Sequence, residues 1–425
     1  MFFIRALLFN FIFMKKIKIL FVILSLTFIA AFVEKDKVGK FVGVRGKEII
    51  TPDGKPILLK GINLGNWLVP EGYMFKFKKT SSPRLIDQAI IELTGPEKST
   101  LFWNEYLNTY ITKEDILYIK KLGFNHVRVP FNYKMLTDEY YLGKNNRGYE
   151  FLDRVVKWCK EAEMYVLLDM HCAPCGQTGD NIDDSYGYPF LFESPQCQEK
   201  ITSIWKDIAV HYKDESIILG YDLMNEPIAH YFENRDTLNK SLVPLYKKIT
   251  KAIREVDPNH LIFLGGAQWN TNFKIFDKPF DDKLVYTFHK YWFKVEPGAI
   301  QEYINFRDKY NVPIYIGETG ENTDEWIKDF RVLLEDNNIG WCFWPYKKMD
   351  NPRCIVSFKI PEGYQNIIAY ADSSRQSFEE IRNKRLLVKQ ADETLHQFNL
   401  ESKMENCYFN AGYIEALGLK PVKIK

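Results

Sequence analysis

Apolar residues along this chain gather in short runs rich in valine, isoleucine, leucine and aromatic side chains, and longer amphipathic segments separate these runs. Apolar runs of about four to eight residues are typical of strands that are buried on both faces, as in a parallel sheet. The pattern therefore predicts eight strands, at residues 58–64, 126–131, 165–170, 217–224, 260–264, 284–288, 313–316 and 340–343.

The segments between these strands have the apolar spacing of helices. The predicted helices lie at 113–122, 151–163, 198–212, 241–256, 299–309 and 323–337. Thr112, Ser241 and Thr323 lie where three of them begin, and serine and threonine commonly cap helix N-termini. Because strands and helices alternate and no strand leads into a glycine-rich dinucleotide-binding motif, we expect an α/β fold of the (β/α)8 TIM-barrel type.

Both ends of the chain carry segments outside this alternation. Three lysines at 15, 16 and 18 precede an apolar run at 19–32, as in a signal peptide, while the apolar residues 2–13 also fit a longer membrane anchor. Short extended runs at 41–45, 48–50 and 57–59 predict small N-terminal β-hairpin elements that close the bottom of the barrel. We therefore expect a signal peptide or N-terminal membrane anchor with a short linker (1–39), a catalytic barrel domain (40–385) and a C-terminal helical extension packed on the barrel (386–425).

Charge and composition limit the classes of partner that the protein can bind. The 425 residues include 57 Lys and Arg against 55 Asp and Glu, so no net charge favours nucleic acid, and a membrane is a partner only through the N-terminal segment. Aromatic residues make up 15% of the chain and suit the faces of sugars, although aromatic rings are first of all core material. We expect a monomer in a secreted, periplasmic or cell-envelope location.

Seven cysteines are too few for a disulfide scaffold, and their odd number leaves at least one unpaired within the chain. Cys172 and Cys175 have the spacing of a redox motif or half a zinc site, but no second pair of ligands lies at metal-binding spacing. We therefore expect structural thiols or a local disulfide there, and neither a metal nor another cofactor.

Polar side chains interrupt the apolar pattern at or just after six of the predicted strands. They are Arg128, His171, Asn225, Glu226, His289, Tyr291, Glu318 and Trp344. In a (β/α)8 barrel the carboxyl ends of all strands meet at one face, where active sites lie. The pattern therefore predicts that these residues line one pocket.

Glu226 and Glu318 are the most informative of these residues, because two facing carboxylates are costly to bury without a chemical reason. Cleavage of a glycosidic bond supplies that reason. One carboxylic acid protonates the leaving oxygen, and one carboxylate about 5 to 5.5 Å away attacks the anomeric carbon when configuration is retained. Arg128 and the Tyr291 hydroxyl can hold the attacking carboxylate ionised.

The order of these residues along the chain, from Arg128 at the second predicted strand to Trp344 after the eighth, resembles that of glycoside hydrolase family five, the large cellulase-like family. The resemblance covers roughly residues 41 to 370. The resemblance implies Glu226 as acid/base and Glu318 as nucleophile. It also implies that Arg128 and Tyr291 support Glu318, and that Asn225 bonds the sugar 2-hydroxyl. By the same resemblance, His171 and His289 shape the subsite at the cleaved bond, and Trp344 forms a platform for the sugar.

Two loops, 61–67 and 171–177, resemble those of the family's exo-acting β-1,3-glucanases and β-glucosidase-like members, except that Cys175 stands where those members more often carry glycine. Residues in the first of these loops and in other loops are further candidates for substrate contact, and for each a surface or packing role is an equal alternative: Asn66, Trp67, Asp183, Asp184, Trp292 and Lys347. We therefore expect a retaining hydrolase of β-glucosides or β-glucans that acts on an oligo- or polysaccharide. The alternatives are a hydrolase of mannan, galactan or glycolipid, a transglycosylase, and a carbohydrate-binding protein without turnover.

Overall fold

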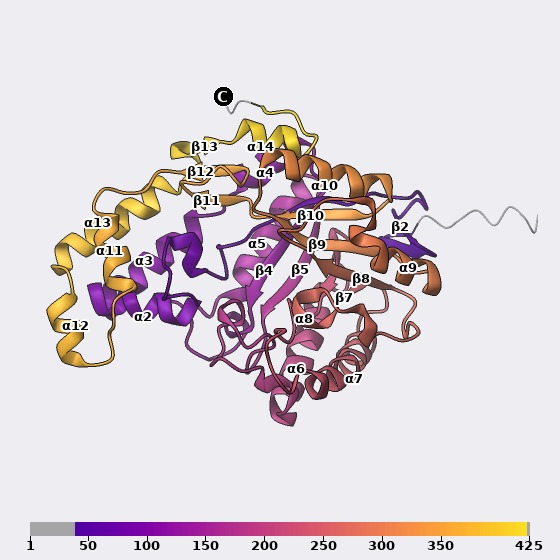
Figure 1. Ribbon diagram of the computed structural model, residues 1–425, viewed down its shortest axis with the longest axis horizontal. Coiled ribbons are helices and arrows are strands. Elements are labelled where there is room, and N and C mark those ends of the chain that lie inside the picture. Colours follow the sequence, from indigo (N-terminus) through magenta and orange to yellow (C-terminus); the bar gives the residue numbers. More distant parts are fainter. Residues whose placement is uncertain (1–38, 423–425) are drawn as a thin grey trace, which may run out of the picture.

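The computed structural model describes residues 39–422 and contains a closed barrel of eight parallel strands (Figure 1). The strands follow the order β10-β3-β4-β5-β6-β7-β8-β9 around the barrel, so each strand pairs with its neighbour along the chain. They are β3 (Lys60–Asn63), β4 (His126–Asn132), β5 (Tyr165–Cys172), β6 (Ile218–Asp222), β7 (Leu261–Gly265), β8 (Leu284–His289), β9 (Ile314–Gly320) and β10 (Gly340–Trp344). Each of the eight predicted strands is present, and the predicted barrel is confirmed.

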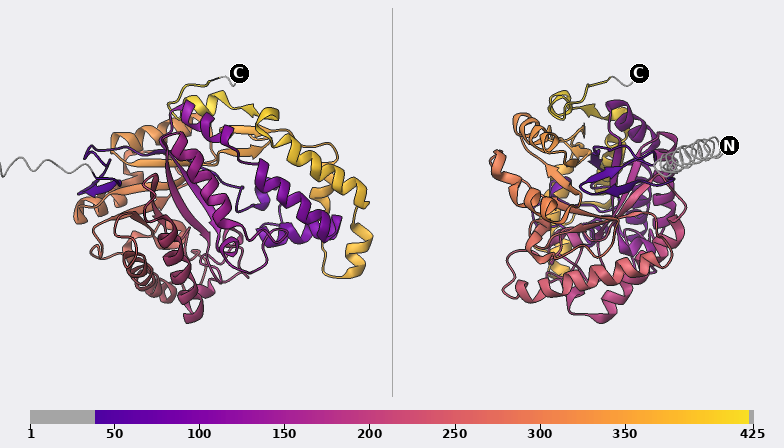
Figure 2. Two further views of the ribbon diagram at one scale, coloured as in Figure 1. Left: turned by 180° about the vertical axis from the view of Figure 1, so that it is seen from behind. Right: turned by 90° about the vertical axis from the view of Figure 1, so that its right-hand side faces the viewer.

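Helices cover the outside of the barrel (Figure 2). They are α4 (Lys113–Leu122), α5 (Gly148–Glu161), α6 (Pro195–Tyr212), α7 (Arg235–Arg254), α9 (Gln301–Tyr310) and α10 (Asp324–Asp336), with a short α8 (Ala267–Asn270) after β7. Thr112 and Thr323 cap α4 and α10 as predicted. The cap predicted at Ser241 is wrong. α7 begins six residues earlier, because buried Leu238 extends the i, i+4 spacing of Leu242 toward the N-terminus.

The N-terminal hairpin closes one end of the barrel, as predicted. β1 (Gly43–Arg45) and β2 (Glu48–Ile50) pair antiparallel, while the third predicted run, 57–59, forms no strand, and only the preceding Pro56 makes an isolated bridge to Ile50. Val42 and Ile49 pack against barrel residues such as Leu167 and Leu219 in a separate apolar cluster. The hairpin thus seals the amino ends of the strands, which leaves the carboxyl face as the open end.

A lobe beside the barrel was not predicted in full. It joins α2 (Pro83–Thr94) and α3 (Pro96–Thr109), which lie between β3 and α4, to α11 (Tyr364–Ala371), α12 (Phe378–Lys384) and α13 (Val388–Glu401) (Figures 1 and 2). Phe398 of α13 lies 6.2 Å from Phe102 of α3 between ring centroids, and both belong to one apolar cluster, so the late helices share a core with the early ones. β11 (Lys347–Met349), β12 (Val356–Phe358) and β13 (Tyr408–Phe409) form a small sheet, and α14 (Ala411–Ala416) packs on α10.

The predicted export segment, residues 1–39, lies almost entirely outside the described residues. Within residues 39–422, none of the helices has the length and apolar character that a membrane span requires.

Candidate active site

A cavity of about 580 Å³ opens at the carboxyl ends of the barrel strands. Sixteen described residues line it: Glu71, Tyr73, His171, Asn181, Ile182, Glu226, His230, Trp269, Thr271, His289, Lys290, Tyr291, Trp292, Glu318, Glu321 and Trp344. Six of the eight residues predicted at or just after strands therefore line it directly, and the other two, Arg128 and Asn225, are buried.

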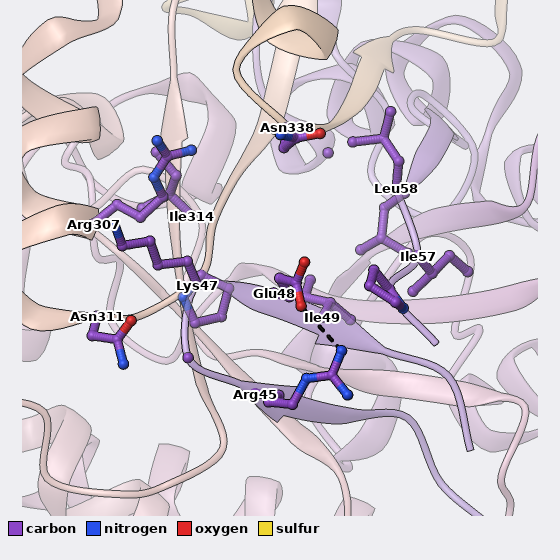
Figure 3. Close-up of a pocket in the computed structure, with 15 residues that line it drawn as sticks. Arg45, Lys47, Glu48, Ile49, Ile57, Leu58, Arg307, Asn311, Ile314 and Asn338 are labelled. Atoms are coloured by element: carbon purple, nitrogen blue, oxygen red, sulfur yellow. Dashed lines mark hydrogen bonds and ion pairs between the residues drawn. The ribbon is translucent and has the colours of Figure 1, made fainter. Parts of the chain in front are cut away.

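A second cavity, of about 680 Å³, lies at the opposite end of the barrel, between the hairpin and the amino ends of β3, β9 and β10 (Figure 3). Glu48 is the only acid among the described residues that line it, and Glu48 pairs with Arg45 (Figure 3). Because it lacks a pair of facing carboxylates, this cavity offers none of the chemistry expected of the site.

Glu226 and Glu318 approach each other across the first cavity. Glu318 lies within β9, and Glu226 follows β6 by four residues. One carboxylate oxygen of each and one ring nitrogen of His289 all lie within 4.8 Å of one another. Both side chains reach the cavity, yet only 9% of Glu226 and 5% of Glu318 is exposed. The two acids can therefore act on the same glycosidic bond.

Arg128 organises the nucleophile candidate from beneath. The guanidinium is fully buried and donates to Glu318 Oε1 at 2.5 Å, to Asp222 at 2.8 Å and to Asn225 Oδ1 at 2.9 Å. It also pairs with Asp169 at 3.0 Å. A planar donor with this many partners fixes the position of Glu318 relative to Asn225. Asp169 and Asp222 each pair with the arginine, which gives a role to two buried acids that sequence reasoning left without one.

The two catalytic candidates have different surroundings, and these separate their protonation states. Burial raises the pKa of Glu226 to about 7. Burial also raises the pKa of Glu318, but the positive charge of Arg128 opposes this rise, and the Tyr291 hydroxyl donates to Glu318 Oε2 at 3.2 Å. At neutral pH, Glu226 is therefore suited to carry a proton while Glu318 is held for attack.

Two histidines connect these acids to the rest of the site. His289 Nδ1 lies 2.9 Å from Glu226 Oε1, and its Nε2 accepts from Asn270 at 3.1 Å. His171 Nδ1 lies 2.7 Å from Asp169, and burial lowers the pKa of His171 to about 4 and that of His289 to about 3. Both imidazoles are thus neutral hydrogen-bonding groups rather than cations.

Trp344 lies flat against His171, with ring centroids 5.5 Å apart and an interplanar angle of 6°. Its indole nitrogen donates to the Tyr73 hydroxyl at 2.8 Å. Gly65 makes room for the ring, since a Cβ there would lie 2.6 Å from the indole. Trp341, in the same strand, is buried in the core, whereas Trp344 lines the cavity.

The backbone around Glu226 adopts an uncommon conformation, with φ of +44° at Glu226 and +59° at Ile228. The loop after β5 holds it in place. Gln177 donates to the Asn225 carbonyl and Thr178 to the Glu226 carbonyl, each at 2.8 Å. Strained backbone of this kind persists where surrounding contacts over-determine it, as they do at this acid.

The loop after β5 corrects several predictions. Cys175 pairs with Cys197 at the start of α6, whereas Cys172 is a buried free thiol, so a local disulfide between Cys172 and Cys175 is wrong. Asp183 accepts from the backbone nitrogens of Thr178, Gly179 and Ser185, and Asp184 pairs with Lys134. These two acids hold the loop together and do not line the catalytic cavity.

Three further loop candidates pack within the protein. Asn66 accepts from the Glu71 nitrogen, the buried Trp67 donates to the Leu107 carbonyl at 2.9 Å, and the fully buried Lys347 pairs with Asp115 at 3.0 Å. None of the three lines the cavity, and these contacts agree with the packing role that was the equal alternative for each. Trp292, in contrast, lines the cavity with 70% of its surface exposed.

Glu71 is the most distinctive residue that sequence reasoning missed. It is buried and lines the cavity, its Oε1 has no hydrogen-bond partner among the described residues, and burial raises its pKa well above the usual range. Tyr73, His230, Trp269 and Glu321 line the cavity as well. Glu71 had a detectable signal, since it is a single acid within the otherwise apolar stretch 67–75.

A (β/α)8 barrel that presents two facing carboxylic acids at the carboxyl ends of its strands, one of them braced by a buried arginine, has the arrangement of a glycoside hydrolase. The chain belongs to glycosyl hydrolase family 5, because residues 86–350, well over half of it, match the family model described as Cellulase (glycosyl hydrolase family 5). The predicted family resemblance is confirmed.

Curated relatives support this membership. The chain is 31% identical over 350 residues to "Beta-xylosidase" from Phanerodontia chrysosporium, and this match covers 72% of this chain and 71% of the relative. It is 29% identical to "Endoglucanase C" from Acetivibrio thermocellus, over 59% of this chain and 88% of the relative. It is 26% identical to "Probable glucan 1,3-beta-glucosidase A" from Aspergillus clavatus, over 50% of this chain and 52% of the relative. The protein is therefore a glycosidase of the family that includes these enzymes.

Proposed function

We propose that this protein is a retaining hydrolase of β-glucosides or β-glucans, with Glu318 as nucleophile and Glu226 as acid/base. The observation that carries the proposal is that a carboxylate oxygen of Glu226 and one of Glu318 lie within 4.8 Å of each other. Retaining glycosidases hold their carboxyl groups about 5 to 5.5 Å apart, whereas inverting enzymes leave about 6.5 to 9.5 Å for a water molecule.

The chemistry proceeds in two displacements. Glu226 gives its proton to the glycosidic oxygen while Glu318 Oε forms a bond to the anomeric carbon and the bond to the leaving oxygen breaks. Glu226, now a carboxylate, takes a proton from water, whose oxygen attacks the anomeric carbon and releases Glu318. Arg128 and Tyr291 hold Glu318 throughout, and His289 remains beside Glu226.

Glucose is the sugar that we propose. The printed names of two relatives, an endoglucanase and a probable glucan 1,3-beta-glucosidase, support it. Trp344 offers a flat apolar ring for one sugar face, and the unpartnered Glu71 Oε1 offers an acceptor for a hydroxyl. Xylosides are the second candidate, because the relative at 31% identity is named a beta-xylosidase. Mannan, galactan, glycolipid and transfer to an acceptor sugar stay alternatives with the same catalytic residues.

We also propose that the protein works outside the reducing cytosol, in a secreted, periplasmic or envelope-facing location. The Cys175–Cys197 disulfide supports this, because disulfides persist mainly in oxidising compartments. The apolar N-terminal pattern with its preceding lysines supports it independently.

The test is hydrolysis of a panel of aryl β-glycosides, β-glucans, mannan and xylan by the wild type, Glu226→Ala and Glu318→Ala. We expect one β-linked substrate to be cleaved, with retained anomeric configuration by NMR and with both variants nearly inactive. Inverted product would overturn the double displacement. A wild type that binds a glycan but cleaves none of the panel would favour the binding-protein alternative.

A further inference from the structure

A chain of hydrogen bonds reaches the acid/base candidate from the loop after β7. The Asn270 side-chain nitrogen lies 3.1 Å from His289 Nε2, and His289 Nδ1 lies 2.9 Å from Glu226 Oε1. Asn270 is fully buried, and only 1% of His289 is exposed. Because both side chains are shielded from solvent, each donor in this chain needs an acceptor within the protein.

The chemistry of these groups gives the hydrogen-bond chain one direction. Burial lowers the pKa of His289 to about 3, so the ring is neutral, and a neutral imidazole donates from one nitrogen and accepts at the other. An amide nitrogen donates, so His289 Nε2 is the acceptor for Asn270. The ring hydrogen then lies on Nδ1, which faces Glu226 Oε1 and lies 3.7 Å from Glu318 Oε2. Both catalytic carboxyl groups therefore face an N–H group and not a lone pair.

The backbone after β7 holds Asn270 in this position. Gln268, Trp269 and Asn270 have φ values of +50°, +62° and +59°, so three consecutive residues occupy the left-handed region that side chains seldom adopt. The Gln268 amide exchanges two hydrogen bonds with the Asn239 amide of α7, which fixes the turn. Strained backbone persists where its surroundings over-determine it, and here it brings one buried amide to one imidazole.

Two glycines leave the space that this contact needs. A Cβ at Gly265 would lie 2.1 Å from Asn270 Oδ1, and a Cβ at Gly317 would lie 2.9 Å from His289 Nε2. Neither glycine has a positive φ, so close approach, and not backbone conformation, requires glycine at both positions. The amide and the imidazole therefore meet directly.

The direction of the hydrogen-bond chain decides which oxygen of Glu226 carries the proton. A lone pair on His289 Nδ1 would accept that proton from Oε1 and withhold it from the substrate. With a hydrogen on Nδ1, Oε1 is the acceptor, and the proton of Glu226 lies on Oε2. Oε2 has no hydrogen-bond partner among the described residues, and Glu226 lines the cavity.

We infer that Asn270 is a positioning residue that fixes the tautomer of His289 and thereby directs the acid proton of Glu226 to Oε2, the oxygen left free for the substrate. In the first displacement that proton passes from Oε2 to the glycosidic oxygen, while the His289 N–H group stays bonded to Oε1. The inference rests on the proposed role of Glu226 and extends it to an amide that touches no substrate.

The tautomer can be measured by heteronuclear NMR of the full chain with isotope-labelled histidine, which shows which ring nitrogen carries the hydrogen. The chain has seven histidines, and His289→Gln identifies the signals of His289 by their loss. We expect the hydrogen on Nδ1 in the wild type at neutral pH. A ring protonated on Nε2, as a reversed Asn270 amide would give, would overturn the inference.

Asn270→Gly tests the consequence for catalysis, because it removes the donor while glycine tolerates the left-handed backbone. The acid then favours the tautomer to which it can donate, so the ring hydrogen should move to Nε2. We expect kcat/KM on a β-glucan, whose leaving group needs a proton, to fall about 10-fold relative to kcat/KM on 2,4-dinitrophenyl glucoside. Asn338→Gly is the matched control and should keep the ratio, because Asn338 has a φ of +54° but lines the second cavity at the other end of the barrel.

An equal loss on both substrates in Asn270→Gly would give Asn270 a purely structural role and overturn the inference, as would an unchanged ratio. If this variant does not fold, the tautomer in the wild type still decides. If the wild type cleaves neither substrate, the proposed function fails, and the NMR measurement tests the role of Asn270 separately.

Discussion

Replacing Glu226 by glutamine tests the assignment of roles to the two acids. Glutamine keeps the shape of the side chain but carries no transferable proton. Because general acid catalysis contributes about 10²- to 10⁴-fold, we expect kcat/KM on a β-glucan, whose alkoxide leaves poorly, to fall by that factor. A 2,4-dinitrophenyl glucoside needs no proton to leave. Its first step should stay near the wild-type rate, with a burst of phenolate and a slow steady state as the glycosyl enzyme accumulates.

The pKa of Glu226 predicts the pH range in which activity on the glucan is lost. Burial raises the pKa of Glu226 to about 7, so the proton needed for the first step is present below that pH and is lost as the pH rises through it. Wild-type kcat/KM on the glucan should therefore fall about 10-fold per pH unit above pH 7. The variant should lack this alkaline limb, because its amide does not titrate.

Azide and the matched variant Glu318→Gln complete the assay. Azide needs no general base, so it should attack the accumulated intermediate of Glu226→Gln and release β-glucosyl azide. Glu318→Gln forms no such intermediate and should give neither a burst nor that product. The reasoning is refuted if Glu318→Gln shows the burst and the azide product, because the two acids would then have exchanged roles.

Two further predictions concern the scaffold of the site. Replacing Cys175 and Cys197 together by serine should lower the free energy of unfolding by about 3 kcal/mol, because the disulfide closes a loop of roughly 20 residues. Denaturant titration measures this difference. An equal midpoint for the wild type and the double variant would count against the prediction. Gly65→Ala places a Cβ 2.6 Å from the Trp344 ring and should reduce kcat/KM at least 10-fold by displacing the sugar platform. Gly298→Ala is the control, because its Cβ meets nothing within 4 Å, and it should keep the wild-type kcat/KM. Equal kcat/KM in the two variants would show that the indole can move without loss of activity.

The barrel and the centre of the site were accessible from the sequence because both follow from periodicity. Apolar runs marked all eight strands, and the carboxyl ends of parallel strands must converge, so polar residues at those ends had to meet. Glu318 and His289 lie within or at the end of their strands, and the direction of their side chains follows from strand alternation. Prediction succeeded where the sheet itself aims the side chain.

The direction of a loop side chain cannot be predicted from sequence periodicity in this way. Asp183 was a candidate for substrate contact because it is an acid in a loop, yet three backbone nitrogens turn it inward. Lys347 lies in β11 and forms a buried ion pair with Asp115, a contact between residues 232 positions apart that no local pattern encodes. Cys175 finds Cys197 rather than the nearer Cys172 for the same reason, since loop geometry and not spacing sets the partner.

The backbone that presents Glu226 has a consequence for engineering. Gln177 and Thr178 fix the carbonyls of Asn225 and Glu226 from the neighbouring loop, which also contributes Asn181 to the cavity wall. Exchanging that loop for one from another family member, in order to acquire a new sugar preference, would also loosen the proton donor. Chimeras that keep both of these side chains should therefore tolerate such grafts, while those that discard them should gain a new pocket at the expense of turnover.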